Sequence, residues 1–539
     1  MKKIIILVCF LFLLHPLYPQ PFTILWNQCI GGTDNDGPSD IIKIDDGYMV
    51  AGATLSNDGD VNSGNHGAAD AWLIKLDLQG NILWERCYGG TSGDNFQRIF
   101  RDSEGSFILT GSSSSTDGDI SYNPYPGSES TWIVKMDSLG NIVWDRIVGG
   151  NATDQQWYAI LTGDDGVLAY GRTASHDGDI SVAYGAWDIW MIKLSNEGEI
   201  EWDFTIGTNF IDEGYGVIQT SDGGYLCSGS CWVSEGTYGN LRCDAYHDLA
   251  EAVLVKLDKD RNIEWQKCYG GSNHDGIATV HELEDGYIFA GSTNSHDGDL
   301  NYNYGESDIW VVKTDFDGNI IWSKSYGGSK TEYASKIFLN ENGGFVVFGT
   351  TNSNDIDVNG NHSGNGQTHD IWVIRLSSTG ELLAQQCIGG GDEERMNWWG
   401  VIKKSDYNYV LAGTTTAGPS FDVTCFTHQI HPIYAEDIWV LEIADTTTGM
   451  QPPPFSAMAG LKAYPNPARD YVCFEYTGQQ IPDANIMIFN SMGAQISNPV
   501  LYNSGSKIIW DTRQVPPGVY FYTYTLAGFT GSGKIVIDQ

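Results

Sequence analysis

Basic residues are scarce in this chain. Its 539 residues contain 29 Lys and Arg against 68 Asp and Glu, a formal net charge of −39. This balance argues against a nucleic-acid partner, because the phosphates would be repelled rather than neutralised. Hydrophobic residues make up 41% of the chain and aromatic residues 12%, so a packed core is expected and disorder is not.

Long apolar runs are missing after residue 20. Within residues 1–20, Lys2 and Lys3 precede an apolar run from Ile4 to Leu14, which is the pattern of a secretory signal peptide. The run is too short to span a bilayer as an anchor. We therefore expect residues 1–20 to be a signal peptide and the protein to be exported without a transmembrane span.

Familiar catalytic motifs are also absent. The chain has no nucleophile elbow, phosphate loop or zinc-protease motif. Carboxylate pairs are so abundant in this acidic chain that none of them indicates a glycosidase. On these grounds the sequence predicts that the protein is not an enzyme.

Internal repetition is the strongest positive feature. The phrase WNQCIGG at Trp26 returns in related form at Trp84, Trp144, Trp202, Trp265 and Trp322, and as AQQCIGG at Ala384. Each repeat contains four strand-like runs, a to d. The a–b and c–d turns are short and carry Asp and Gly, while the b–c connection is long and polar. This pattern predicts an all-β fold, a seven-bladed β-propeller with four-stranded blades over residues 21–445.

The two ends of the repeat region complement each other. The region begins with a lone d strand around Thr23–Cys29 and ends at a c strand, DIWVLEIAD, with no d strand after it. We expect the N-terminal strand to complete the seventh blade, since this removes two exposed strand edges.

Two residue types recur at fixed positions of the repeat. Tryptophan begins strand c in six blades, and packing between blades explains it better than sugar stacking, because a ligand would not need every copy. Cysteine recurs near the end of strand d, where buried apolar packing is expected because equivalent positions on different blades are poorly placed for mutual disulfides. Cys231 and Cys243 share one loop and are the best disulfide candidates. The tryptophans are Trp72, Trp132, Trp190, Trp310, Trp372 and Trp439, and the cysteines are Cys29, Cys87, Cys268 and Cys387.

The c–d segment, for example VVKTDFDGNIIW, shows the pattern D-x-x-G-x-x-x-W. It resembles the tryptophan-docking repeats of quinoprotein dehydrogenase propellers, which usually carry eight blades and bind a quinone with calcium. The vicinal cysteine pair and the cofactor site of those enzymes have no counterpart here, so the resemblance supports the architecture. The repeats are more similar to those of secreted Bacteroidetes propeller proteins.

After Asp445 the repeat stops. A Pro- and Gly-bearing linker over 446–460 leads into residues 461–539, whose strand-like runs predict a small β-sandwich. This segment resembles the type A C-terminal sorting domain of the Bacteroidetes type IX secretion system, in YPNPARDYV from Tyr464, FNSMGAQI from Phe489, VPPGVYFYTY from Val515 and the terminal GKIVI. The resemblance implies passage across the outer membrane by the type IX secretion machinery, removal of the domain and attachment at the cell surface or release.

Two acidic patterns have competing explanations. An acidic residue follows every d strand, where it could form a ring that concentrates cations or, more simply, accept backbone N–H groups in a turn. These residues are Asp36, Asp94, Asp154, Asp212, Asp275, Glu332 and Glu394. In the blade-six b–c loop, Asp355, Asp357, Asn359 and Asp370 are spaced like the start of a calcium loop, although Asx turns explain the same residues without metal. Calcium is thus a possible cofactor, with no other cofactor expected.

Ligand recognition is expected where the blades differ. The b–c loops of blades four and seven replace the common Asp-Gly-Asp pattern by aromatic and His residues, which suit recognition on a rigid scaffold or pack locally. Cys425, His428 and His431 lack the paired half of a zinc site.

The sequence predicts a secreted or surface-attached binding or scaffold protein for an extracellular protein or glycan. An extracellular glycan hydrolase or quinoprotein-like oxidoreductase is the alternative. The candidate residues are Trp232, Tyr238, Tyr246, His247, Phe426, His428, His431 and Tyr434.

Overall fold

The chain divides into two compact units, with the boundary between Asp445 and Thr446. The computed structural model describes residues 21–539, except for 233–237, 243–249, 301, 341–342, 364–365, 429–434, 447–460, 465–467, 470, 477–483, 491–495, 497–500, 505–506, 514, 527–528 and 539. Every secondary-structure element in the described part is a β-strand. The same residues contain no helix of the length and apolarity that crossing a membrane requires.

The a and b strands of the first unit follow the predicted repeat. The a strands of blades one to seven are β2 (Asp36–Ile44), β6 (Asp94–Arg101), β10 (Asp154–Leu161), β14 (Asp212–Gln219), β18 (Asp275–Leu283), β22 (Glu332–Leu339) and β26 (Glu394–Ser405). The b strands are β3 (Gly47–Thr54), β7 (Phe107–Ser113), β11 (Val167–Thr173), β15 (Tyr225–Trp232), β19 (Gly286–Thr293), β23 (Phe345–Thr351) and β27 (Asn408–Thr415).

The c and d strands complete the blades. The c strands are β4 (Asp70–Asp77), β8 (Ser130–Met136), β12 (Asp188–Leu194), β16 (Ala250–Leu257), β20 (Asp308–Thr314), β24 (Asp370–Leu376) and β28 (Asp437–Asp445). The d strands of blades one to six are β5 (Ile82–Tyr88), β9 (Ile142–Val148), β13 (Ile200–Ile206), β17 (Ile263–Tyr269), β21 (Ile320–Tyr326) and β25 (Leu382–Ile388), and β1 (Phe22–Ile30) takes this place in blade seven.

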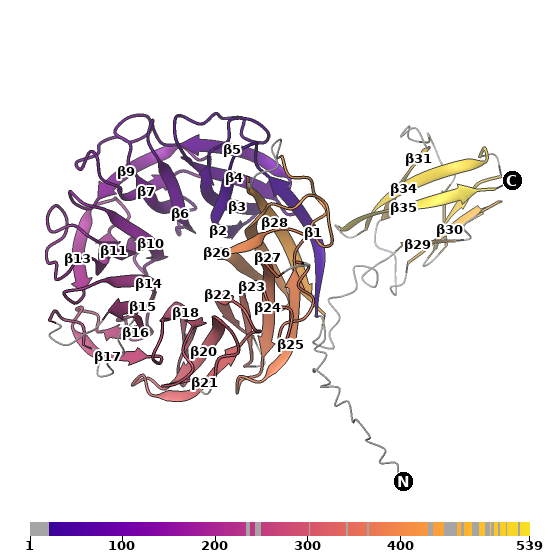
Figure 1. Cartoon of the computed structure of the whole chain (residues 1–539). Helices are drawn as coiled ribbons and strands as arrows, with labels where there is room; N and C mark the ends of the chain where they lie inside the picture. The colour runs from indigo at the N-terminus through magenta and orange to yellow at the C-terminus, as the bar shows by residue number, and fades with distance from the viewer. Residues whose placement is uncertain are drawn as a thin grey trace, which may run out of the picture. The chain divides into compact units, whose positions relative to one another are not determined.

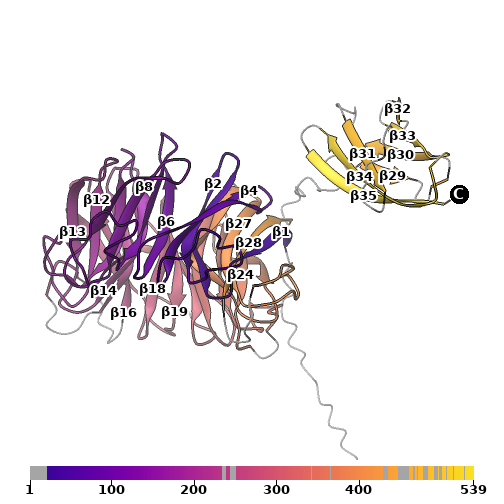
Figure 2. The same ribbon diagram turned by 90° about the horizontal axis from the view of Figure 1, so that it is seen from above.

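Within the described residues, these strands pair as seven antiparallel sets in the order a-b-c-d. The a strands surround the axis and the d strands form the rim (Figure 1), and the strands run between the two faces of the ring (Figure 2). A single parallel pair, Asp40 with Trp399, joins the first blade to the last. The all-β, propeller-type prediction is confirmed.

Closure of the ring follows the prediction as well. β1 pairs antiparallel with β28, from Phe22 opposite Asp445 to Ile30 opposite Ile438. Asn27 on β1 reinforces the pairing, since its side-chain oxygen accepts hydrogen bonds from Trp439 Nε1 at 3.4 Å and from the Thr424 backbone N–H at 3.3 Å. The two ends of the repeat region are therefore held in one blade.

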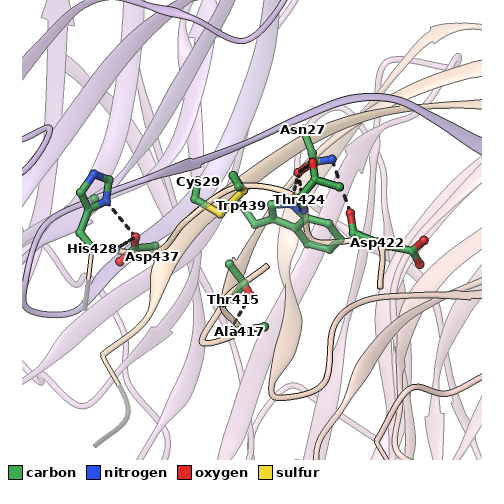
Figure 3. The surroundings of a disulfide bond; sticks show 12 residues. Asn27, Cys29, Thr415, Ala417, Asp422, Thr424, His428, Asp437 and Trp439 are labelled. Atoms are coloured by element: carbon green, nitrogen blue, oxygen red, sulfur yellow. Dashed lines mark hydrogen bonds and ion pairs between the residues drawn. A yellow bond between two sulfur atoms is a disulfide. The ribbon is translucent and has the colours of Figure 1, made fainter. Parts of the chain in front are cut away.

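A disulfide covalently links the same two ends (Figure 3). Cys29 on β1 is bonded to Cys425 in the b–c loop of blade seven, 396 residues away in sequence. The expected buried-packing role is thus wrong for Cys29, because the loop of its own blade reaches out to the rim strand. It is wrong for Cys268 too, which is also disulfide-bonded. It holds for Cys87 and Cys387, which are buried thiols.

The expected Cys231–Cys243 pair is wrong. Cys231 is a buried thiol at the end of β15, whereas Cys243 lies outside the described residues. Burial raises the pKa of the Cys231 thiol well above its ordinary value, so the thiol stays protonated.

The recurrent tryptophans have the predicted packing role. The six that begin strand c are 0–1% exposed. Each indole N–H donates a hydrogen bond to a side chain in the middle of the d strand of the same blade. Trp72 donates to Glu85 at 2.9 Å and Trp310 to Ser323 at 2.8 Å, for example. A buried indole with its N–H satisfied stabilises the contact between blades.

The glycine of the c–d turn explains why D-x-x-G and the d-strand tryptophan recur together. Gly80 has a φ of +82°, and a Cβ there would lie 2.5 Å from the ring of Trp26 in the preceding blade. Gly140 and Gly318 meet the rings of Trp84 and Trp265 in the same way. Glycine adopts this backbone conformation without a Cβ that would meet the ring, so the motif links neighbouring blades; blade four has Arg261 at this position, with a φ of +69°.

The second unit contains two sheets around one core. One sheet has the order β29 (Leu461–Tyr464), β30 (Tyr471–Tyr476), β33 (Lys507–Asp511), β32 (Leu501–Ser504), and the other β31 (Ala484–Asn490), β34 (Gly518–Leu526), β35 (Phe529–Ile537). Both contribute buried residues to a shared cluster that includes Phe474, Ile488 and Trp510. This is the arrangement of a small β-sandwich, as the sequence predicts.

Replacement of Cys425 by Ala should lower the apparent Tm of the propeller. The change removes a cross-link that spans almost the whole ring, and losing a native disulfide costs roughly 2–5 kcal/mol. Thermal unfolding followed by circular dichroism without reductant measures the effect. Phe426→Ala is the matched control, because Phe426 is 78% exposed beside Cys425 and leaves the disulfide in place. An equal Tm for wild type and Cys425→Ala would contradict the covalent role in closure.

Candidate functional site

The d–a turns and the b–c loops share one face of the ring, because strand a begins and strand b ends there. Contacts in blade one illustrate this arrangement. Asp58 in the b–c loop accepts a hydrogen bond from the Thr33 backbone N–H at 2.8 Å, and the Asp60 backbone N–H donates to the Gly31 carbonyl at 2.8 Å. We call this side the long-loop face and the opposite side the hairpin face.

The recurrent acids after the d strands are buried turn residues. All seven are at most 4% exposed, so they do not form a charged ring at the surface. Asp36 accepts from the Gly32 backbone N–H at 2.7 Å and from the Ser56 hydroxyl at 2.8 Å, and Asp275 repeats this with Gly271 and Ser295 at 2.8 Å each. The simpler of the two sequence explanations is correct.

Further buried carboxyl groups lie between the blades. Asp308, at the start of β20, is buried; its Oδ2 accepts from the Tyr304 backbone N–H at 2.7 Å, and its Oδ1 has no hydrogen-bond partner among the described residues. Burial raises the pKa of Asp308 to about 7, and the neighbouring Glu332 and Asp357 carboxylates add to the effect. Burial also raises the pKa of Asp212 and of Glu394 to about 7.

The proposed calcium ligands of blade six have protein partners. Asp355 accepts from the Ser329 backbone N–H at 2.7 Å, Asp357 from Gly327 at 3.5 Å, and Asp370 contacts His362 Nδ1 at 2.7 Å. The Asn359 backbone N–H donates to Gln385 at 3.4 Å. In the part of the chain that the structure describes, no group of three or more His, Cys, Asp and Glu side chains is placed to hold a metal ion. Calcium binding stays a prediction.

A cavity of about 860 Å³ opens among blades four to seven. Its walls come from the first residues of the a strands and the last residues of the b strands, which places it on the long-loop face near the axis. Its large or charged lining residues include Glu213, Tyr215, Trp232, His274, Tyr333, His369 and Arg395.

Aromatic rings form the blade-four and blade-six sides of the cavity. Trp232 is 38% exposed and its ring centroid lies 5.7 Å from that of His274. Tyr333 is 51% exposed at the start of β22. Tyr215 stacks on Trp157 with an interplanar angle of 7°. Partly exposed rings on rigid strands offer flat apolar surfaces to a ligand.

The lining carboxylates are engaged within the protein. Glu213 forms an ion pair with Arg172 and accepts from the Tyr215 hydroxyl at 2.7 Å. The Arg172 guanidinium in turn lies 4.4 Å from the ring centroid of Trp157 and 4.1 Å from that of Trp187. The other lining carboxylate, Asp275, is one of the buried turn residues.

At the blade-seven end of the cavity, one carboxylate contacts both an arginine and a histidine. Glu393 Oε1 accepts from Arg395 Nε at 2.5 Å and lies 2.7 Å from His369 Nδ1. Burial opposes ionisation of Glu393, but the hydrogen bonds from His369 and Arg395 hold its pKa below the usual value. The Arg395 side chain remains 55% exposed.

The structure brings one sequence-predicted ligand residue, Trp232, into the cavity. Tyr238 is 62% exposed on the blade-four loop outside the lining, and Phe426 is exposed beside the disulfide. His428 contacts Asp437 at 3.0 Å and Asp60 at 3.6 Å between blades seven and one. Tyr246, His247, His431 and Tyr434 lie outside the described residues.

Sequence reasoning missed the residue that directly follows each recurrent acid. Glu213, Gly276, Tyr333 and Arg395 hold this position in blades four to seven, and all four line the cavity. Blades one to three carry Gly37, Asn95 and Gln155 there. The sequence did contain a signal for these residues. The position after the recurrent acid varies from blade to blade within a regular repeat, which indicates that the fold does not depend on the residue there.

Residues 462–538 match the secretion system C-terminal sorting domain. The second unit is therefore a type IX sorting domain, as its motifs predict, and it marks the protein for export to the cell surface or beyond. Interaction with the type IX secretion machinery follows from this domain.

Other likenesses are more distant. The regulatory protein FlaEY of Caulobacter vibrioides is 27% identical over 162 residues, covering 28% of this chain and 17% of that protein. Among solved structures, puromycin hydrolase is 11% identical with a TM-score of 0.42, covering 82% of this chain and 58% of the hydrolase. A variant of the Synechocystis apocarotenoid oxygenase is 9% identical with a TM-score of 0.31, covering 67% and 93%. The propeller assignment rests on the strand pairing of the chain itself.

Deletion of residues 461–539 should leave the protein in the periplasm of its host, because the sorting domain directs passage across the outer membrane. Fractionation followed by immunoblotting of periplasm, surface and medium measures the distribution, with the full-length chain as the control. Appearance of the truncated protein at the surface in normal amount would contradict the assignment.

Asp308→Asn should change how the stability of the propeller depends on pH. The folded pKa of Asp308, about 7, exceeds the ordinary value of 3.8, so its contribution is present below pH 3.8 and is lost as pH rises through 7. An uncharged Asn avoids this loss. The free energy of unfolding of the variant relative to wild type should therefore rise by a few kcal/mol between pH 5 and pH 9.

Urea unfolding at the two pH values measures the difference. Asp317→Asn, an exposed carboxylate on the hairpin face, should show no such change. A pH-independent difference for Asp308→Asn would mean that this carboxyl is ionised throughout.

Proposed function

We propose that the protein is an exported binding protein whose cavity, formed by blades four to seven, holds a saccharide. The observation that supports this most directly is the pairing of partly exposed rings, Trp232 and Tyr333, with hydroxyl and amide side chains in one concave site. Ser230, Ser292, Asn294 and Asn352 are among the lining residues. Sugar rings present an apolar face for stacking and hydroxyl groups for hydrogen bonding, so this mixture suits them.

The shape of the site favours a saccharide over a protein surface. A cavity of about 860 Å³ suits a short segment of a saccharide chain, whereas protein–protein interfaces spread over a broad and flatter area. Both lining carboxylates serve other groups of the protein, Glu213 through Arg172 and Asp275 through its turn. This arrangement supports binding rather than hydrolysis, since glycosidases need two carboxyl groups facing the bond to be cut.

Trp232→Ala and Tyr333→Ala should each weaken binding about tenfold or more, because each removes a stacking surface worth roughly 1.4 kcal/mol or more. A glycan array identifies the ligand, and isothermal titration calorimetry measures the variants. Tyr122→Ala is the matched control, since Tyr122 is 73% exposed in the b–c connection of blade two, away from the cavity lining. Unchanged affinity in both cavity variants, with folding intact, would contradict the proposed site.

A further inference from the structure

One exposed cation lines the cavity of this strongly acidic chain. The protein has a formal net charge of −39, yet the exposed charged side chain that lines this cavity at the blade-seven end is an arginine. Arg395 pairs with Glu393 but remains 55% exposed, whereas Glu213 is 21% exposed in its pair with Arg172 and Asp275 is buried in its turn. A cation displayed inside an otherwise anionic protein selects for an anionic group on the ligand.

Arg395 is held in a fixed direction. Glu393 accepts from its Nε at 2.5 Å and is itself held by His369 Nδ1 at 2.7 Å. Nε carries one of the five N–H donors of a guanidinium, and the planar group favours bidentate contact with a carboxylate. Ordering the side chain before the ligand arrives reduces the entropy that binding costs. Glu393 and His369 thus act as positioning residues.

Arg395 and Tyr333 occupy equivalent positions on neighbouring blades. Each directly follows the buried acid that begins its a strand, Glu394 in β26 and Glu332 in β22. Because the repeat places equivalent residues side by side around the axis, both side chains reach the same cavity. A sugar ring stacked on Tyr333 would therefore share the cavity with Arg395.

We propose that Arg395 binds the carboxylate of a uronic acid, so that the ligand of the cavity is an acidic polysaccharide. This inference rests on the proposed function. In the other six blades the equivalent residues are Gly37, Asn95, Gln155, Glu213, Gly276 and Tyr333, none of which is a cation. The site thus has one carboxylate-binding end, which sets the direction in which the saccharide chain lies.

The test compares uronate oligosaccharides with their methyl esters, which keep the sugar rings and remove the charge. Isothermal titration calorimetry with oligogalacturonate, oligomannuronate and the esters should show at least tenfold tighter binding of one acidic form to wild type. Arg395→Gln should remove this preference, so that the variant binds the acidic form and its ester with affinities within about twofold of each other. Arg395→Lys should retain part of it, since the charge remains without the planar fork.

Arg101→Gln is the control. Arg101 pairs with Asp45 at 2.9 Å at the end of strand a that faces the hairpin face, so its loss should leave the acid preference intact. Saccharide binding that depends on Tyr333 but shows no preference for the acid over the ester would overturn this inference and leave the proposed function standing. Absence of any saccharide binding that depends on Trp232 or Tyr333 would overturn both.

Discussion

Pairing between the first and last strands of the propeller is the interaction on which the remainder of the structure depends. Recurrent buried tryptophans and turn glycines pack neighbouring blades together, but a ring held only by these contacts would open at the point where the chain enters and leaves. β1 removes that weak point by hydrogen bonding along β28. The Cys29–Cys425 disulfide adds a covalent link in the same blade. Closure lets seven similar units act as one rigid support.

Rigidity of the ring comes from groups that repeat, and recognition comes from groups that do not. Most blades repeat the buried acid, the paired glycines and the strand-c tryptophan. These groups make contacts within the protein and are not available to a ligand. Trp232, Tyr333 and Arg395 occur once each in their respective positions. They stand on strand ends that the repeat fixes in space, so the ligand groups are ordered without being part of the core.

Export and fold are consistent with each other. A chain that leaves the cytoplasm meets an oxidising environment, where Cys29 and Cys425 can pair and stabilise the ring. The sorting domain is a separate compact unit with its own core around Trp510. Its motifs lie in a continuous stretch of the chain, which is why the amino-acid sequence alone is enough to recognise them.

The sequence by itself determined the all-β repeat, the closing strand and the sorting domain, because each is written in local patterns: turn residues at fixed offsets, alternating apolar runs and motifs in order. Burial in the folded chain was needed to show that the recurrent acids serve turns rather than a surface ring. Only the tertiary structure decided that Cys29 meets Cys425 and that Glu213, Tyr333 and Arg395 line one cavity. These residues are far apart in sequence and converge only when the blades close around a common axis, so no local pattern reports their proximity.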